Sequence, residues 1–185
     1  MSGGRGRGTA QIGRLGGGWR SSRNGRRSLL LACCGQIRLD LLFTLNGTVA
    51  APTEIGTTPW GMRRIFPILG GRFEGPKLRG RLLAGGTDYM LGRGDSVLIP
   101  DVRATLETVD GHLILMNYSG YRHGPAEVMD RLARGDAVDP SEYYFRIAPR
   151  FETGSQKYAW LNRTLAVGTG HRLPAGPTYD IYEVL

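Results

Sequence analysis

Glycine residues interrupt the stretch 61–86 at short intervals, and this spacing constrains the fold more than any other feature of the chain. Glycine is selected where φ must be positive or where two backbones pass closely, so the pattern predicts tightly connected strands rather than helices. Ionisable residues stand inside the same strand-like runs, which indicates a sheet whose inner face is partly polar. Since polar, concave interiors bind or transform ligands, the stretch predicts a ligand-binding interior.

The remaining sequence also favours short strands. Alternation of polar and apolar residues predicts a strand over 37–45, and Asp110-Gly111 predicts a hairpin between 97–109 and 112–119. One helix is expected, over 126–134, because Gly124-Pro125 precedes it and Gly135 follows it. Further strands are predicted over 62–69, 72–74, 77–83, 88–91, 142–148 and 178–184, and 158–167 is ambiguous at its start. About eight to ten short strands with one helix predict a mainly β fold, an antiparallel sandwich or barrel.

The net charge of +8 is unevenly distributed along the chain. The first 37 residues contain seven arginines and no acid, which leaves 17 basic and 16 acidic side chains for the rest. A Gly/Arg/Ser-rich segment cannot bury enough apolar surface to order itself, so we expect a disordered extension over 1–36 and one domain over 37–185. An RNA-binding arginine–glycine segment, an export signal over 26–33 and an organellar transit peptide are the alternatives. The basic charge therefore predicts no nucleic-acid partner for the domain.

Metal, cofactor and membrane classes lack their usual sequence signals. The two cysteines, Cys33 and Cys34, are adjacent and fall in the expected extension, and His112, His123 and His171 lack metal-ligand spacing. There is neither a phosphate loop nor a dinucleotide fingerprint, and no run approaches the ~18 apolar residues of a membrane span. We therefore expect no metal, no cofactor and no membrane partner, and a cytoplasmic location. A homodimer is left open.

Residues 101–107 alternate between polar and apolar side chains, with Asp101 and Arg103 on the polar face. One interpretation is an antiparallel strand whose polar face meets solvent. The functional interpretation turns Asp101 and Arg103 into the interior, where the aspartate moves a proton and the arginine holds a carboxylate or a developing enolate. We expect the second arrangement, with both residues largely buried, lining a cavity, and with Tyr118 or Tyr158 within reach.

Tyr158 completes the catalytic candidates. It lies near Asn162 whether its segment is extended or helical, although the two could instead satisfy each other's hydrogen bonds in the core. Arg146, within an aromatic strand, is a candidate anion contact, and surface snorkelling is the alternative. The expected substrate-binding residues are Arg64, Asp88, Tyr118, Arg146, Trp160 and Asn162.

Several short motifs together resemble one family. They are GMRR (61–64), GGRFEGPKLRG (70–80), GGTD (85–88), DVR (101–103), TVDG (108–111), YFR (144–146), FETG (151–154) and YAWLNR (158–163). The chain is similar, over about 37–185, to a domain-of-unknown-function family of small single-domain bacterial and fungal proteins. The resemblance implies a lipocalin-like β-barrel and no established reaction, and the basic extension falls outside it.

A small barrel can hold one ligand when its own side chains do not fill it. We therefore expect a cofactor-independent isomerase, cyclase or lyase that acts on a small, largely apolar metabolite bearing a carbonyl. Asp101 would be the acid/base, Arg103 and Arg64 would stabilise charge, and Tyr118, Tyr158 and Asn162 would orient the substrate. A non-catalytic small-molecule-binding barrel, or carrier, is the alternative.

Overall fold

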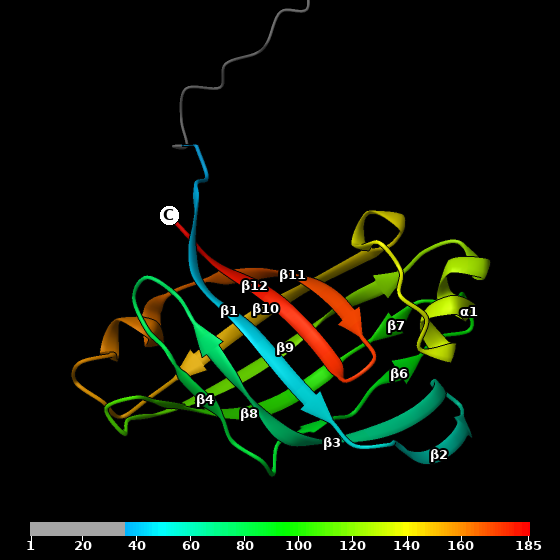
Figure 1. The fold of residues 1–185 in the computed structure, drawn as a ribbon, viewed down its shortest axis with the longest axis horizontal. Coiled ribbons are helices and arrows are strands. Elements are labelled where there is room, and N and C mark those ends of the chain that lie inside the picture. The colour runs from blue at the N-terminus through cyan, green and yellow to red at the C-terminus, as the bar shows by residue number, and fades with distance from the viewer. Residues whose placement is uncertain (1–35) are drawn as a thin grey trace, which may run out of the picture. The chain divides into compact units, whose positions relative to one another are not determined.

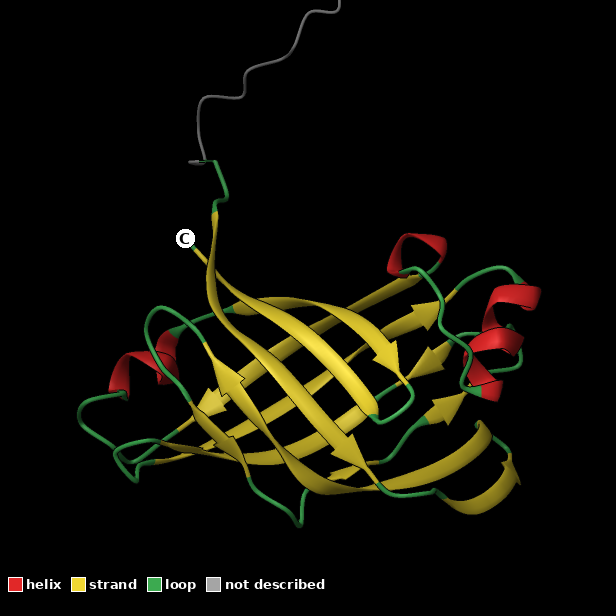
Figure 2. Ribbon diagram, in the orientation of Figure 1, coloured by secondary structure: helices red, strands yellow, loops and turns green. Residues whose placement is uncertain are grey.

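A computed structural model describes residues 36–185, and Figures 1 and 2 show its ribbon. This range forms twelve β-strands, one α-helix and two 3-10 helices. The helices are α1 (Ala126–Arg134), η1 (Pro140–Glu142) and η2 (Ala159–Arg163). The strands are β1 (Leu39–Val49), β2 (Thr53–Thr58), β3 (Gly61–Glu74), β4 (Gly80–Leu82), β5 (Thr87–Asp88), β6 (Leu91–Gly92), β7 (Leu98–Ile99), β8 (Asp101–Thr108), β9 (Leu113–His123), β10 (Tyr144–Glu152), β11 (Ala166–Leu173) and β12 (Gly176–Val184).

The strands close into an antiparallel barrel. β1 pairs with β12, followed in turn by β11, β10, β9 and β8. The short strands β4 and β5 join β8 to β3, and β3 pairs with β1, so the sheet has eight positions around the barrel and closes on itself. The predicted single lipocalin-like barrel with one short helix is confirmed. Closure removes the exposed sheet edges that an open arrangement of these strands would leave.

One half of the barrel is filled by its own side chains. The ring of Phe43 lies 5.2 Å from that of Phe73 and 6.0 Å from that of Phe151, between ring centroids. Leu106 and Ile114 are completely buried in the same cluster. β1 supplies the centre of this cluster at a bulge between Leu41 and Phe43, which turns the adjacent residues Leu42 and Phe43 both inward.

The two ends of the barrel are built differently. α1 and η1 lie at the end where β6 and β7 are found, and η2 lies at the opposite end (Figure 2). α1 has the predicted bounds, with Val128 and Leu132 buried. It ends at Gly135, whose φ of 85° gives the left-handed cap that glycine adopts without steric cost. The Asp110-Gly111 hairpin also forms as predicted, between β8 and β9.

Several segments differ from the sequence-based expectation. The strands predicted over 88–91 and 97–109 are each divided, the first into β5 and β6 and the second into β7 and β8. The predicted loop 46–60 contains β2, which pairs with β3.

The strands expected over 62–69 and 72–74 are one continuous strand, β3, because Gly70 and Gly71 both pair with β1 instead of forming a turn. Gly70 has a φ of 139° at an irregularity in this pairing, which glycine tolerates best. At Gly71 a side chain would collide with the backbone of Asn46, since its Cβ would lie 2.1 Å from that carbonyl oxygen, so this glycine permits close strand contact.

The expected extension over 1–36 lies, apart from Gln36, outside the described residues, and so do the alternatives considered for it. Within 36–185, no helix has the length and apolar character needed to cross a membrane.

Candidate functional site

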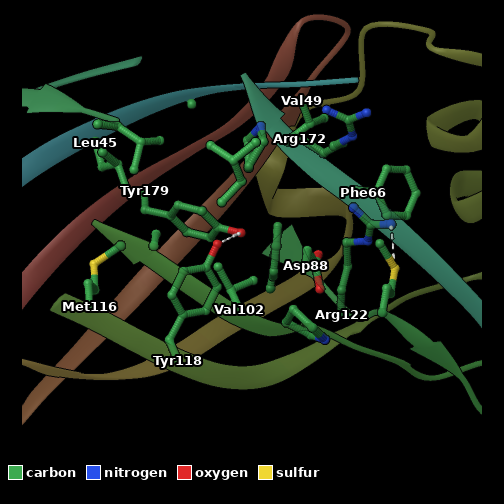
Figure 3. Close-up of a pocket in the computed structure, with 18 of the residues that line it drawn as sticks. Leu45, Val49, Phe66, Asp88, Val102, Met116, Tyr118, Arg122, Arg172 and Tyr179 are labelled. Atoms are coloured by element: carbon green, nitrogen blue, oxygen red, sulfur yellow. Dashed lines mark hydrogen bonds between the residues drawn. The ribbon is translucent and has the colours of Figure 1, made fainter. Parts of the chain in front are cut away.

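The other half of the barrel contains a cavity with about 70 Å³ of water-accessible volume. A single water needs on the order of 10–15 Å³ by this measure, so the cavity has room for a small ligand. Most of the lining is apolar, from side chains that include Leu45, Val49, Phe66, Met90 and Val102 (Figure 3). Ionisable side chains line it at five positions, Asp88, Tyr118, Arg122, Arg172 and Tyr179. A mostly apolar cavity with a few converging polar groups is the usual form of a small-molecule site.

The strand register places Asp88 in a row of inward-facing residues. Asp88 on β5 pairs with Phe66 on β3 and with Val102 on β8, and Val102 pairs with Tyr118 on β9. Residues directly opposite in neighbouring strands share one face of a sheet, so all four side chains line the cavity. Asp88 is therefore held by regular strand pairing on both sides.

Asp88 is the one carboxylate in the cavity lining. Its Oδ1 accepts a hydrogen bond from the backbone N–H of Asp101 at 3.1 Å, and no other partner for this carboxylate exists among residues 36–185. Burial raises the pKa of Asp88 to about 6, against the opposing effects of that N–H and of the Arg122 charge. At pH 7 the group is therefore about nine-tenths ionised. Its pKa lies about one unit below neutral pH, and general acid/base groups are most effective when their pKa is near the working pH.

Tyr118 and Tyr179 form a buried hydroxyl pair beside Asp88. Tyr118 Oη donates to Tyr179 Oη at 3.2 Å, and the rings meet edge to face with centroids 5.3 Å apart (Figure 3). Burial raises the pKa of both phenols, so both stay protonated at neutral pH. The mutual bond uses one of the two hydroxyl hydrogens, and the other is therefore free to donate to a ligand.

Tyr179 is held in position by its neighbours on β10 and β11. Phe145 packs edge to face against its ring at a centroid distance of 5.4 Å. Gly170 pairs with Tyr179, and a Cβ at Gly170 would lie 2.5 Å from the Phe145 ring. The absence of a side chain at Gly170 thus makes room for the aromatic contact that orients the Tyr179 hydroxyl.

Arg122 reaches the cavity from the last part of β9. It pairs with Leu98 on β7 and with Phe145 on β10, and its guanidinium carbon lies 5.4 Å from the centre of the Phe145 ring. Nη2 faces the sulfur of Met90 at 3.9 Å, which is a weak acceptor. Nε is buried and has no hydrogen-bond partner among the described residues. Burial lowers the pKa of Arg122, and the nearby charge of Arg172 also lowers it, but an arginine remains a cation at neutral pH.

Arg172 is the second cation in the cavity lining. Its backbone N–H donates to the Tyr143 hydroxyl at 2.9 Å, and its Nη1 donates to the Leu173 carbonyl at 2.8 Å. These two bonds fix the end of β11 and leave most of the guanidinium donors without a protein acceptor in the described part of the chain. Burial lowers its pKa.

The predicted inward orientation of Asp101 and Arg103 is wrong. Their side chains are 51% and 62% exposed and form an ion pair with each other at 3.3 Å on the outer surface. Val102 and Ala104 face the cavity instead, because burial of the apolar face of β8 outweighs any gain from enclosing the charged one. Tyr118 shares the inward face with Val102 and so points away from Asp101. Asp101 affects the cavity through its backbone N–H, which bonds Asp88, and through its charge, which adds to the raised pKa of Asp88.

Tyr158, Trp160 and Asn162 do not line the cavity. The Tyr158 hydroxyl donates to Asp110 at 3.0 Å, at the β8–β9 turn, which is the opposite end of β9 from Arg122. Asn162 makes two hydrogen bonds to the backbone of Thr153. Trp160 packs against the core cluster. These contacts attach η2 to the barrel at the end that contains the β8–β9 turn. Tyr158 and Asn162 do not hydrogen-bond to each other, which was the alternative interpretation.

The two remaining arginine candidates also lie outside the cavity lining. Arg146 is on the outer face of β10, where its guanidinium lies 5.1 Å from the centre of the Tyr144 ring. Arg64 is half-buried, and its guanidinium lies 6.0 Å from the Phe66 ring, so it stands at the edge of the cavity. Of the nine candidates, the structure places Asp88 and Tyr118 in the lining, and their part in substrate binding stays a prediction.

Three of the ionisable lining residues were not found by sequence reasoning, namely Arg122, Arg172 and Tyr179. Each had a signal. Arg122 has the same strand parity as Tyr118, but the predicted strand ended at Ser119, whereas β9 continues to His123. Tyr179 has the parity of the buried Ile181 on the predicted last strand. Arg172 follows the Gly168-Thr-Gly170 segment, which suggests a loop in the sequence but pairs with β12 in the structure.

No group of three or more His, Cys, Asp or Glu side chains within residues 36–185 is arranged to hold a metal ion. The polar groups that line the cavity are hydroxyls, guanidinium groups and one carboxylate. Such a set suits an organic ligand with oxygen functions.

The fold and the cavity together define a class of protein: a small closed β-barrel with an apolar interior cavity that contains a carboxylate, a phenol pair and two guanidinium groups. The chain belongs to the family described as Protein of unknown function (DUF3237), whose model matches residues 37–184. A UPF0311 protein of Rhodopseudomonas palustris is 37% identical over 144 residues, which cover 78% of this chain and 94% of the relative.

Solved structures share the barrel. A beta-barrel like protein from Acinetobacter baumannii is 45% identical, with a TM-score of 0.73, and the match covers 82% of this chain and 98% of that one. A protein described as an enzyme from Penicillium herquei matches with a TM-score of 0.63 at 23% identity, over 82% of this chain and 97% of that one. The second likeness concerns the fold alone.

Proposed function

We propose that the protein is a cofactor-independent isomerase, cyclase or lyase, which acts on a small carbonyl compound inside the barrel cavity. The three reaction classes share one requirement, the removal of a proton from the substrate and its return to another atom. The observation that supports this most strongly is a single carboxylate, Asp88, with a pKa near 6, beside a hydroxyl pair in an apolar cavity.

Each group has a defined part in the proposal. The Asp88 carboxylate takes a proton from the carbon next to the substrate carbonyl, and the electron pair moves onto the carbonyl oxygen to give an enolate. The free hydroxyl hydrogen of the Tyr118–Tyr179 pair donates to that oxygen as charge develops on it. Protonated Asp88 then returns the proton at a different atom, which regenerates the carboxylate. The apolar lining excludes water, so these interactions are stronger than they would be in solution.

Asp88 thus replaces Asp101 as the proposed acid/base. Asp101 is half-exposed and paired with Arg103 on the outer wall, whereas Asp88 faces the cavity and has an unpartnered oxygen. The likeness to the Penicillium herquei protein supports the proposal only as an analogy of architecture.

The test is hydrogen–deuterium exchange at the carbon next to a carbonyl, followed by proton NMR in D₂O. Two probes are used, phenylacetone and phenylpyruvate, which share a benzylic CH₂ beside a carbonyl. The wild-type chain is expected to accelerate exchange of at least one probe, with a rate that rises with pH through about 6 as Asp88 ionises. Asp88→Asn is expected to lose about 10²- to 10⁴-fold of the rate, which is the usual contribution of a general base.

Asp101→Asn is the matched control, because it removes a carboxylate from the outer wall. It is expected to keep the acceleration of both probes, with the rise in rate moved to slightly lower pH because the Asp101 charge adds to the raised pKa of Asp88. Exchange that is equally fast in wild type and Asp88→Asn would contradict the proposal, and so would a wild-type rate no greater than that in buffer for both probes.

A non-catalytic binding barrel is the second candidate. The small volume and largely apolar lining favour it, since both also suit a carrier. A carrier would bind either probe without accelerating exchange, so the same experiment separates the two functions.

A further inference from the structure

The charges in the cavity do not balance. Among the residues that line it, Arg122 and Arg172 are cations and Asp88 is the one anion. Neither arginine forms an ion pair with a carboxylate of residues 36–185. Buried charges are costly unless they are paired and hydrogen-bonded, so at least one positive charge here lacks the partner that burial ordinarily requires.

Asp88 does not neutralise both arginines. Its Oδ1 is bound to the Asp101 N–H, and no hydrogen bond joins it to either guanidinium. The nearby charges do affect one another, since the Arg122 charge lowers the pKa of Asp88 and the Arg172 charge lowers that of Arg122. The two guanidinium groups therefore repel each other inside one cavity, and an anion between them would relieve this repulsion.

The free donors of Arg122 have the geometry that a carboxylate uses. The Nε–H and one Nη–H of an arginine lie along one edge of the guanidinium plane and bind the two oxygens of a carboxylate in parallel. At Arg122 this edge consists of Nε, which is buried and has no hydrogen-bond partner among residues 36–185, and Nη2, whose contact is the weak acceptor sulfur of Met90. The stacking on Phe145 holds the plane in place without using these donors.

We propose that Arg122 and Arg172 form an anion-binding subsite, so that the ligand of this barrel is a carbonyl compound that also bears a carboxylate. The inference rests on the proposed function for the carbonyl and adds the negative charge. In Figure 3 the arginines lie on the side of the cavity away from the Tyr118–Tyr179 hydroxyls, with Asp88 drawn between. A ligand would place its carboxylate at the arginines and its reacting carbonyl toward the phenols.

The test compares the affinities of the two probes, which differ in one group. Phenylpyruvate has a carboxylate where phenylacetone has a methyl group, and titration calorimetry at pH 7.5 gives a Kd for each. The wild-type chain is expected to bind phenylpyruvate more tightly by about 10-fold or more, because hydrogen bonds between charged groups are stronger than those between neutral ones. Asp88→Asn is expected to bind phenylpyruvate still more tightly, because it removes the one negative charge of the lining.

Arg122→Gln and Arg172→Gln should each reduce the preference for phenylpyruvate, and the double variant should abolish it. Arg146→Gln, which removes a guanidinium from the outer wall, is the matched control and should keep the preference. Arg122→Lys provides a second test if the glutamine variants fold poorly. It retains the charge but not the planar edge, and we expect a preference between those of wild type and Arg122→Gln.

Equal affinity of the wild type for the two probes would overturn the subsite, and so would a preference that survives in the double variant. These outcomes are distinct from failure of the proposed function. Asp88-dependent exchange without a charge preference would contradict the subsite alone. An arginine-dependent preference without any exchange would contradict the reaction alone and leave an anion-binding carrier.

Discussion

The two halves of the barrel use the same strands for different purposes. In the packed half, the inward positions of β1, β8 and β9 are Phe43, Leu106 and Ile114, which fill the interior completely. In the cavity half, the next inward positions on β8 and β9 include Val102 and Tyr118, and the space between them is left open. The contrast shows how eight strands both stabilise a domain and provide a site, since an interior of this width is either filled or holds one small ligand.

The packed half should be the more sensitive to truncation. Phe43→Ala removes a ring that contacts both Phe73 and Phe151, and we expect a loss of about 3–5 kcal/mol in the free energy of unfolding. Leu165→Ala is the control, because that side chain is 68% exposed, and its effect should be within about 0.5 kcal/mol. Urea denaturation measures both. A loss at Phe43 no larger than at Leu165 would show that the packed half does not stabilise the barrel.

The protein should instead become more stable when the charge of Asp88 is removed from the cavity half. The folded pKa of Asp88, about 6, lies above the unfolded value of about 3.9. The folded state therefore favours the protonated acid. The contribution of Asp88 to the free energy of unfolding is fully present below pH 4 and is lost as the pH rises through 6. Relative to wild type, Asp88→Asn should become more stable between pH 4 and pH 7, by up to about 2–3 kcal/mol.

The measurement for Asp88 is the difference in unfolding free energy between variant and wild type at several pH values. Asp130→Asn, on the exposed face of α1, is the control and should show no such trend. A difference that stays constant, or that falls with rising pH, would mean that Asp88 is not destabilised by burial.

The phenol pair is expected to show coupling of intermediate size. Tyr118→Phe or Tyr179→Phe leaves one buried hydroxyl without its partner, at a cost of about 1–3 kcal/mol, whereas replacing both leaves no unsatisfied group. The double variant should therefore be less destabilised than the sum of the single ones. Strict additivity of the changes in unfolding free energy in this double-mutant cycle would contradict a stabilising hydrogen bond between the two hydroxyls.

The smallest effect is expected on the outer wall. Arg103→Gln breaks a surface ion pair with Asp101, and exposed pairs contribute about 0.2–1 kcal/mol. The melting temperature should therefore change by no more than a few degrees, and deuterium exchange of phenylacetone should stay at the wild-type rate. A large loss of exchange activity in this variant would indicate that the site lies on the outer face of β8.

The barrel could be predicted from the sequence because its local signals agree with its fold. Proline and glycine mark both ends of α1, and Asp110-Gly111 marks the β8–β9 turn, so these elements formed where they were expected. Strand alternation showed correctly that Asp101 and Arg103 share a face. The pattern contains no information on which face is inside, because an exposed wall and a polar cavity give the same alternation.

The cavity was harder to predict because its ionisable residues come from four strands, β5, β9, β11 and β12, which lie far apart in the sequence. Arg122 and Arg172 look like ordinary surface arginines at the ends of strands. The inward direction of Arg122 depends on β9 continuing beyond Ser119, where Arg122 pairs with Leu98 on β7. That of Arg172 depends on the β11–β12 hairpin, in which it pairs with Pro177. Asp88 lies on a two-residue strand, too short for periodicity to assign a face.

The central claim is that the carboxylate in the cavity, Asp88, moves the proton, and the exchange experiment tests it most directly. The rate of deuterium incorporation into phenylacetone or phenylpyruvate is compared in wild type, Asp88→Asn and Asp101→Asn across pH 4–8. The account predicts that wild type and Asp101→Asn both accelerate exchange, with a rate that rises through about pH 6 in wild type and at slightly lower pH in Asp101→Asn, and that Asp88→Asn shows almost no acceleration. Full acceleration in Asp88→Asn, or its loss in Asp101→Asn, would contradict the account.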